Sequence, residues 1–233
     1  MDKTKNILGI CILCGFLAVA AAIIVGVNIW TASSRSVYVK GLCEREVLAD
    51  RAIWPIVFKE GGNSLADLSA SVQGKNTTVV EWLKEAGFTD DEISVSYPKI
   101  EDTRTYSFSD NNRPFDFIMT SVVTVCSSQV EKVISAQHRQ FDLLEKGIAV
   151  SGTAWEYPVT FSFNALNEIK PEMIETATRN ARAAADKFAQ DSGSRVGKII
   201  SATQGQFSIS ERDSNTPQIK IVRVVTTVQY QLK

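Results

Sequence analysis

The single histidine of the chain, His138, is the first side chain to consider as a general base. It stands in "SAQHRQF" on the polar side of a helical pattern, which indicates a solvent-exposed residue. A serine–histidine–aspartate triad needs a nucleophile on a strained turn, but Ser151 in "VSGTAW" has no such motif around it. Asp90 and Asp91 in "TDDE" fit a turn between a helix and a strand. We therefore predict no catalytic residue.

The four cysteines are the next candidates for redox or metal chemistry. Cys11 and Cys14 have suitable spacing but stand inside an apolar run, where thiolates are costly, so we interpret them as ordinary membrane-helix residues. Cys11 also follows Ile10 near the start of that run, which does not fit a lipidation signal. Cys43 and Cys126 can form a disulfide outside the cytoplasm or remain separate buried thiols.

Metal, cofactor and nucleic-acid binding are not indicated by the sequence. One histidine and scattered acids give no ligand spacing, and no glycine-rich phosphate loop follows a strand. Lysine and arginine total 25 against 26 acidic residues, whereas a nucleic-acid binder usually carries a basic excess. Asp50 and Glu46 remain as candidate carboxylates of an enzyme or small-ligand-binding protein. A cleft with two or more buried acids would favour that class.

The N-terminal apolar run indicates where in the cell the protein is located. Residues 7–30 are almost wholly apolar, and as a helix they would be about 36 Å long against a hydrocarbon core of about 30 Å. We predict a short cytoplasmic tail at 1–6, an uncleaved transmembrane signal anchor at 7–30, and a main domain at 36–233. Cleavage after "TAS" at 31–33 is the alternative.

Orientation follows from Lys3 and Lys5, which favour a cytoplasmic N-terminus. The protein is then expected to cross the inner (cytoplasmic) membrane once. Its main domain would lie in the periplasm or otherwise outside the cytoplasm.

Any functional surface must be positioned by the fold of the main domain. The sequence of the first half of this domain predicts strands around two helices. "SVYVKGLCEREVLAD" and "RAIWPIVFKE" indicate adjacent strands, and "EISVSYPKI" and "FDFIMTSVVTV" a pair joined by the exposed loop "SFSDNNRP". The first helix is predicted to break at "QGKN", to restart at a Thr78–Glu81 capping box and to end at Gly87. The second opens with Ser128 and Glu131 and ends before Gly147. Its predicted apolar side comprises Val130, Val133, Ile134, Phe141 and Leu144.

A third helix is predicted in "KPEMIETATRNARAAADKFAQDSG", with Pro171 in the first turn and Gly193 just past the end. Its charges pair at helical spacing, Glu175 with Arg179 and Arg182 with Asp186, so the basic residues are neutralised and are not set out for phosphate. The predicted buried stripe comprises Ile174, Ala177, Ala181, Ala184 and Phe188.

The remaining strands complete the predicted fold. "IAVSGTAWEYPVTFSFNAL", "GKIISATQGQFSI" and "QIKIVRVVTTVQYQL" are strand-like. The predicted order is β-β-α-β-β-α-β-α-β-β, an α+β domain whose antiparallel-rich sheets are covered by about three helices and preceded by one transmembrane helix. In the last strand, Ile219 and Ile221 lie on one face, opposite Val222 and Val224, which predicts cover on both faces.

Three segments carry a resemblance to a known family. "IETATRNARAAADKFAQDSGSRVGKIISATQG" resembles the C-terminal signature of the SIMPL domain family, "VYVKGLCEREVLADRAIWPIVF" its first hairpin, with Gly41 and Asp50, and "IKIVRVVTTVQYQL" its last strand. The resemblance spans about residues 36–232. It implies an extracytoplasmic α+β protein from a family with ring-like homo-oligomers and links to envelope stress, whose biochemical role is generally unknown. It carries over no site residue.

Two functions are therefore predicted as alternatives. The favoured one is a membrane-anchored structural or interaction module of the cell envelope that forms a homo-oligomer larger than a dimer, with protein partners not identified. The other is the carboxylate-based enzyme or small-ligand binder. Exposed strand edges and apolar surface would favour the first.

Overall fold

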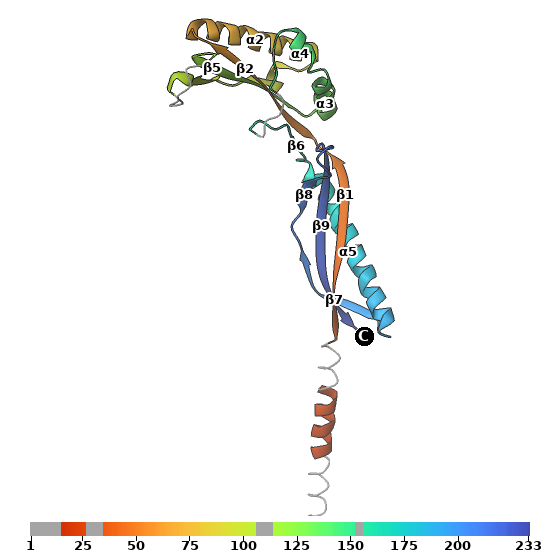
Figure 1. Ribbon diagram of the computed structural model, residues 1–233. Coiled ribbons are helices and arrows are strands. Elements are labelled where there is room, and N and C mark those ends of the chain that lie inside the picture. The colour runs from red at the N-terminus through yellow and green to blue at the C-terminus, as the bar shows by residue number, and fades with distance from the viewer. Residues whose placement is uncertain (1–14, 27–34, 106–113, 152–155) are drawn as a thin grey trace, which may run out of the picture. The chain divides into compact units, whose positions relative to one another are not determined.

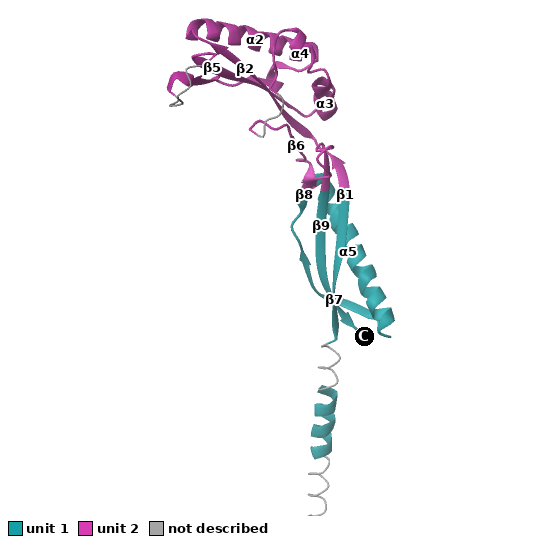
Figure 2. Cartoon of the chain, viewed as in Figure 1, with its two compact units in different colours: residues 1–45, 168–208, 222–233 teal, residues 46–167, 209–221 magenta. Residues whose placement is uncertain are grey.

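The computed structural model describes residues 15–26, 35–105, 114–151 and 156–233. The chain divides into two units and contains two antiparallel sheets, of which the first lies mainly in unit 1 and the second in unit 2 (Figures 1 and 2). Unit 1 comprises residues 1–45, 168–208 and 222–233, and unit 2 comprises residues 46–167 and 209–221.

The first sheet has the strand order β1-β9-β7, and β8 also pairs with β9. Its elements are β1 (Ser36–Leu48), β7 (Val196–Gln204), β8 (Ser208–Glu211) and β9 (Ile219–Leu232), with the long helix α5 (Leu166–Asp191) beside the sheet (Figure 1). At one end of β1 the Leu232 N–H donates to the Arg35 carbonyl (2.9 Å), and at the other end the Ala49 N–H donates to the Gln218 carbonyl (2.8 Å). Both hydrogen bonds fit the same antiparallel register, so β1 and β9 are paired in one register along their whole length.

Helix α5 packs on this sheet through small side chains, as predicted, but with a different stripe. A Cβ on Gly41 of β1 would lie 1.9 Å from the Ala177 carbonyl oxygen and 2.5 Å from Ala181 N, so the glycine permits the close approach. Phe188, expected in the stripe, is 60% exposed. Ile174 and Ala184 are only partly buried. The buried positions recur every four residues: Met173, Ala177, Ala181, Ala185 and Ala189.

The second sheet has the order β3-β5-β2-β6, with β4 also paired to β5. It comprises β2 (Arg51–Gly62), β3 (Ile93–Val95), β4 (Lys99–Asp102), β5 (Phe117–Ser127) and β6 (Thr160–Ser162). Strands β2 and β5 pair without interruption from Ala52↔Ser127 to Gly62↔Phe117.

The core of unit 2 lies between this sheet and its helices. The helical elements are α2 (Leu65–Glu85), η1 (Asp90–Glu92), η2 (Thr103–Thr105), α3 (Val130–His138) and α4 (Asp142–Glu145). The predicted inward face of β2 is confirmed: Ala52, Trp54, Ile56 and Phe58 are at most 2% exposed. Trp54 meets Trp82 of α2 edge-on, with ring centroids 6.2 Å apart.

The predicted hairpin between the first two strands is wrong, because β1 and β2 belong to different sheets. The chain changes sheet at two consecutive residues. Ala49 N–H donates to Gln218 beside β9, and Asp50 N–H donates to Ser162 of β6 (2.9 Å). Adjacent strands in the sequence usually pair, so this crossing depends on partners that come much later in the chain.

The predicted element order also needs correction. Within the described ranges the order is β-β-α-β-β-β-α-α-β-α-β-β-β, leaving out the short 3-10 turns and the segment before residue 35. "EISVSYPKI" contains two short strands, β3 and β4, and the segment from 196 to 211 contains β7 and β8. The mixed α+β class with antiparallel sheets is confirmed.

The first predicted helix break does not occur, since α2 runs through "QGKN" without interruption. Tertiary contacts hold this stretch: Lys75 pairs with Glu60 of β2, and the Asn76 side chain accepts a hydrogen bond from buried Ser121 of β5 (2.8 Å). Thr78 is therefore no cap, and its hydroxyl donates to the Gly74 carbonyl (3.1 Å).

The other helix ends show which local signals were reliable. Gly87, Gly147 and Gly193 all have positive φ, at 90°, 74° and 67°, so the three predicted helix ends are confirmed. The predicted starts were wrong. Helix α5 begins at Leu166, which puts Pro171 inside it, and Gln129, not Ser128, is the N-cap of α3.

The helical segment after Ser128 is two short helices. The chain leaves α3 after His138, and Phe141 stands before α4, 75% exposed, while Leu143 is fully buried. Leu144 is 49% exposed. The predicted burial of Phe141 and Leu144 is therefore wrong.

Part of the N-terminal segment is described. Residues 15–26 are helical. Among the described residues, no helix is both long and apolar enough to span a bilayer. The remainder of the predicted anchor at 7–30, including Cys11 and Cys14, lies outside the described residues.

Candidate functional site: a surface on the first sheet

The two faces of β9 differ in how far they are covered. Val222, Val224, Val228 and Tyr230 are at most 1% exposed, and Val228 and Tyr230 pack in one apolar cluster with Ala181 and Ala185 of α5. The alternate residues are only partly buried or exposed: Ile219, Ile221, Arg223, Val225, Thr227 and Gln229. The predicted cover on both faces is therefore met on one face only, within the part of the chain that the structure describes.

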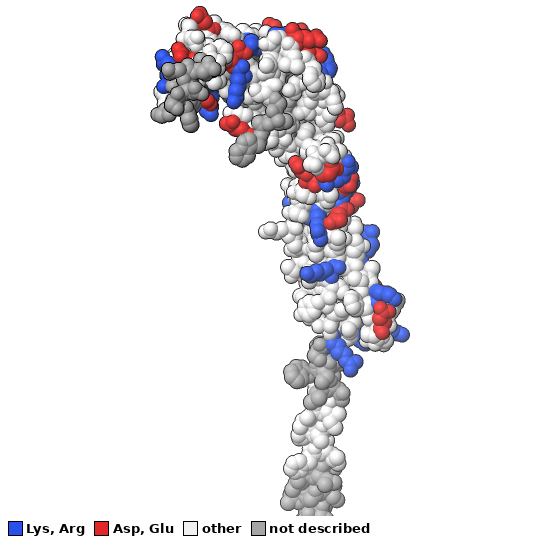
Figure 3. Space-filling view, in the orientation of Figure 1, with Lys and Arg blue, Asp and Glu red and all other residues white. Residues whose placement is uncertain are grey.

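The uncovered face of this sheet carries mixed side chains. Tyr38 and Leu42 of β1, 67% and 39% exposed, alternate with the residues that face α5. Glu44 and Arg223 form an ion pair across β1 and β9 (3.4 Å). Figure 3 shows acidic and basic side chains gathered at the end of the sheet near β8, and scattered basic side chains among neutral ones over the rest of the side that it displays. A surface that mixes apolar, neutral and charged groups in this way is suited to contact with protein.

The β1 edge of this sheet presents free backbone groups. Because β1 and β9 keep one register from Arg35↔Leu232 to Ala49↔Gln218, the even-numbered residues of β1 direct their N–H and C=O groups away from β9. The Asn180 side chain of α5 donates to one of these outward carbonyls, that of Leu42 (2.8 Å). An edge of this length is a template for pairing with another strand.

The opposite edge, at β7, is more exposed. Residues 198–204 are exposed on both faces of the strand, and Ile199 and Ile200 are 52% and 50% exposed. The pairing with β9 shifts register on either side of Ile199. Irregularities of this kind limit uncontrolled pairing at sheet edges, so this edge exposes two isoleucines yet is restricted in what it can join.

The outer face of α5 is neutralised in the predicted way. Glu175 pairs with Arg179 (2.5 Å) and Arg182 with Asp186 (3.3 Å), both four residues apart. Arg182 also lies over the Tyr230 ring, 5.2 Å from its centroid. Its charge therefore serves packing as well as solubility, which the sequence pattern did not indicate.

The two candidate carboxylates are each engaged in structural bonds. Asp50 accepts the backbone N–H groups of Asn164 and Ala165 (both 2.7 Å), just before the start of α5. Glu46 pairs with Arg212 (3.4 Å) and its side chain is 58% exposed. The described residues include no buried aspartate or glutamate. The condition that would favour a carboxylate-based site is therefore not met there.

Two other acids have lowered pKa values for structural reasons. The Ser127 hydroxyl, which is buried, donates to Glu92 (2.5 Å) and lowers the pKa of that carboxyl below 4.5. In the turn "RDSNT", the Thr216 hydroxyl and then Arg212 lower the pKa of Asp213 to about 2. Both carboxylates organise the chain around them, one at the entry to α3 and one in a surface turn.

The remaining side chains considered for catalysis, redox chemistry or metal binding do not come together in one site among the described residues. His138 is exposed at the last residue of α3, as predicted. Cys43 and Cys126 are both free thiols and partly buried, so the structure shows no disulfide between them. No group of three metal-ligating side chains occurs among residues 15–26, 35–105, 114–151 and 156–233.

A hollow of about 290 Å³ occurs in unit 2, beside α3 and α4. It is lined by Gln137, Gln140, Phe141, Leu144 and Val150. These lining residues include no ionisable group, so they provide no acid, base or nucleophile. The sequence pattern gave no indication of this hollow, because it predicted Phe141 and Leu144 in the core.

A comparison with protein families gives a match over most of the chain. The SIMPL family model, described as a protein of unknown function (DUF541), matches residues 37–230, well over half of the chain. A comparison with curated proteins finds no match.

Proposed function

Because the chain belongs to the SIMPL family, whose function is unknown, we propose that it is a membrane-anchored module that assembles with copies of itself. The observation that carries this proposal is the first sheet, which has two exposed edges and one face without a helix. A chain that leaves so much strand surface open needs either protective features or a partner.

Anchoring is supported by the helix at residues 15–26. Phe16, Leu17, Ile23, Ile24 and Val25 are each between 56% and 72% exposed, so this helix carries large apolar side chains on its surface. Exposed apolar helix surface is unfavourable in water and favourable in hydrocarbon. We infer that residues 7–30 cross the inner membrane once and leave residues 36–233 outside the cytoplasm.

Assembly beyond a dimer is supported by the two unlike edges of the sheet. When the β1 edge of one copy contacts the β7 edge of the next, the contact is head-to-tail, and repeated contacts build a ring or a filament. A shared membrane raises the local concentration of copies and strengthens weak contacts. We also propose that the module acts in the cell envelope and is linked to envelope stress.

The alternative of a carboxylate-based enzyme has no observation in its favour, because Asp50 and Glu46 act in capping and surface pairing. Light scattering on the detergent-solubilised full chain tests assembly. We expect a mass above that of a dimer, and we expect Ile221→Asp to lower it by placing a charge on the open face of β9. Ile100→Asp, at an exposed position of β4 in unit 2, is the matched control. A monomer at tens of micromolar, on the order of concentrations at which weak interfaces still form, would contradict the proposal.

A further inference from the structure

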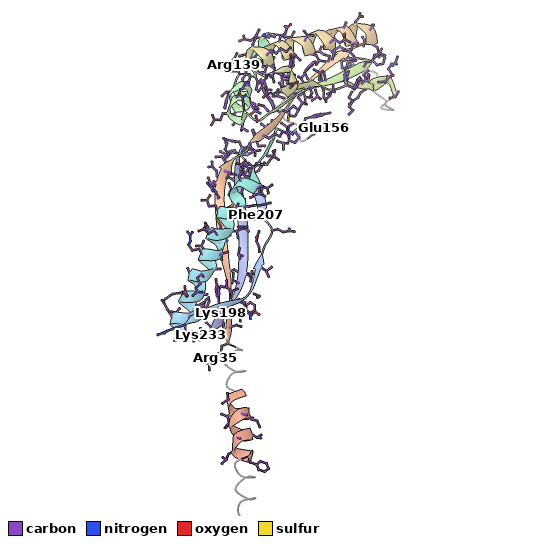
Figure 4. The ribbon with its side chains drawn as sticks, turned by 180° about the vertical axis from the view of Figure 1, so that it is seen from behind. Arg35, Arg139, Glu156, Lys198, Phe207 and Lys233 are labelled. Carbon is purple, nitrogen blue, oxygen red and sulfur yellow. The ribbon has the colours of Figure 1, made fainter. Side chains whose placement is uncertain are left out.

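One end of the first sheet gathers positive charge from three neighbouring strands. Arg35 precedes β1, Arg195 precedes β7, and Lys233 follows β9. Their backbones are adjacent: Arg195 and Lys233 exchange two hydrogen bonds of 2.8 Å, and the Arg35 carbonyl accepts from Leu232 N–H (2.9 Å). Figure 4 shows Arg35, Lys198 and Lys233 at the same end of the sheet. We call Arg35, Arg195, Lys198 and Lys233 the basic end.

The four side chains of the basic end are all exposed, and none of them has an ion-pair partner among the described residues. Elsewhere in unit 1 most cations pair with acids. The paired ones are Arg45, Arg179, Arg182, Lys187 and Arg223. The basic end therefore differs from the neutralised remainder of its own unit.

The sequence explains this lack of partners. No aspartate or glutamate occurs in residues 3–43, 192–210 or 214–233, the three segments that supply β1, β7 and β9 at this end. Isolated surface cations are ordinary, but four on adjoining strand ends, without an acid in the segments that carry them, create a local positive potential.

We propose that the basic end binds the anionic phospholipid headgroups of the membrane surface from which the domain emerges. The inference rests on the proposed anchor, because only residues 31–34 separate the predicted span from Arg35. The five residue-to-residue steps from 30 to 35 extend at most about 18 Å, so Arg35 stays close to the membrane surface. A cation is attracted to an anionic membrane surface when it lies within about a Debye length of it, which is about 10 Å at 0.1 M salt. Each such cation raises the population of domain bound to the surface about fivefold.

A lipid surface fits these residues better than a single free phosphate. The four cations come from three strand ends and spread across the end of the sheet, and none of them is buried in a cradle around one ion. A flat array of exposed cations matches a layer of headgroups, whereas a phosphate site brings several donors onto one group. Binding would hold the strands of the first sheet at a set angle to the membrane.

The test uses the full chain in vesicles of phosphatidylcholine, alone or with about 30% phosphatidylglycerol, a content chosen to create a negative surface potential. Flotation after an alkaline wash first establishes whether the chain is anchored. Hydrogen exchange of residues 195–201 then reports on the basic end, and residues 99–102 of unit 2 serve as the internal reference. We expect exchange at 195–201 to slow at least about fivefold in the anionic vesicles and to recover at about 0.5 M salt.

The variants separate the charge effect from folding. Arg195→Gln with Lys198→Gln should abolish the difference between the two vesicle types. Arg51→Gln with Lys59→Gln, which removes the same charge from exposed positions of β2, should retain it.

Each other outcome overturns a different claim. Loss of flotation contradicts the anchor of the proposed function. Flotation with equal exchange in both vesicle types contradicts lipid binding and leaves the anchor standing. Protection by inorganic phosphate in pure phosphatidylcholine vesicles, at matched ionic strength, would assign the basic end to a soluble anion and overturn the lipid proposal.

Discussion

Residues 119–123 of β5 in the second sheet are buried on both faces, whereas residues 198–204 of β7 in the first sheet are exposed on both. In β5, Thr120 and Val122 are 5% and 8% exposed on one face, and Met119 and Val123 are at most 2% exposed on the other. The two units thus differ in how completely they bury their own strands. A unit whose strands are buried by its own side chains needs no partner to cover them. A unit with open sheet edges and an uncovered face is suited to assembly and surface contact.

The strongest test of this comparison is removal of the aromatic centre of unit 2. Trp82→Ala should lower the free energy of unfolding of this unit by about 3–5 kcal/mol, because the ring is 2% exposed and packs edge-on against Trp54. Urea unfolding followed by the fluorescence of the remaining tryptophans measures the loss. A self-sufficient unit 2 should show this loss at every protein concentration, and Trp82→Phe should show a smaller one.

The close approach of β1 and α5 provides the corresponding test in unit 1. Gly41→Ala should destabilise this unit by about 1–3 kcal/mol or more, because the new Cβ meets helix backbone that has no rotamer to move. Gly74→Ala in α2 is the matched control, since nothing lies within 4 Å of its Cβ position. That substitution should stabilise the protein by about 0.4–1 kcal/mol. Thermal melts that shift equally in both variants would show that β1 and α5 are not tightly packed.

The helix side of the same contact predicts a graded pair. Ala181→Leu should cost about 1–3 kcal/mol, because Ala181 is fully buried and extra methylene groups cannot fit. Arg182→Gln, one residue further along, should cost less than about 1 kcal/mol, since its ion pair is half-exposed. Chemical unfolding of the two variants decides the matter. Similar midpoints would mean that the small-residue stripe does not face a core.

The smallest expected effect is a pH dependence in unit 2. The pKa of Glu92 is lowered in the folded state, first by the Ser127 hydroxyl, so its contribution to stability is present above the unfolded pKa near 4.5. This contribution is lost as pH falls through the folded pKa. Ser127→Ala should therefore make unfolding less dependent on pH below about 4.5, with little change in the dependence above it. An unchanged pH profile in Ser127→Ala would remove the link between the two residues.

Local signals in the sequence predicted several features correctly. The glycines that end the helices were identified because positive φ is a property of the residue itself, and Gly87, Gly147 and Gly193 all adopt it. The alternation in β2 and the charge pairs on α5 were equally local, since side-chain periodicity follows from the backbone alone. The family was identified in the same way, from segments that resemble it.

Features that depend on distant partners were predicted less well. "QGKN" has the composition of a break, yet Glu60 and Ser121 hold it helical. Phe141 looked like a core residue until the chain turned after His138 and placed Leu143 inside. Propensity is a weak prior, and tertiary contacts overrode it in both cases.

Patterns within short segments of the sequence were enough to predict the helix ends, the inward face of β2, the family and the apolar run at 7–30, because each depends on neighbours a few residues apart. Three features became visible only in the folded chain: β1 and β2 separate into different sheets, Asp50 caps the approach to α5, and four cations meet at one sheet end. These depend on contacts between segments that are distant in the sequence, most of them more than a hundred residues apart. No periodicity in a single segment encodes such contacts, because they are selected by the free energy of the whole packed chain.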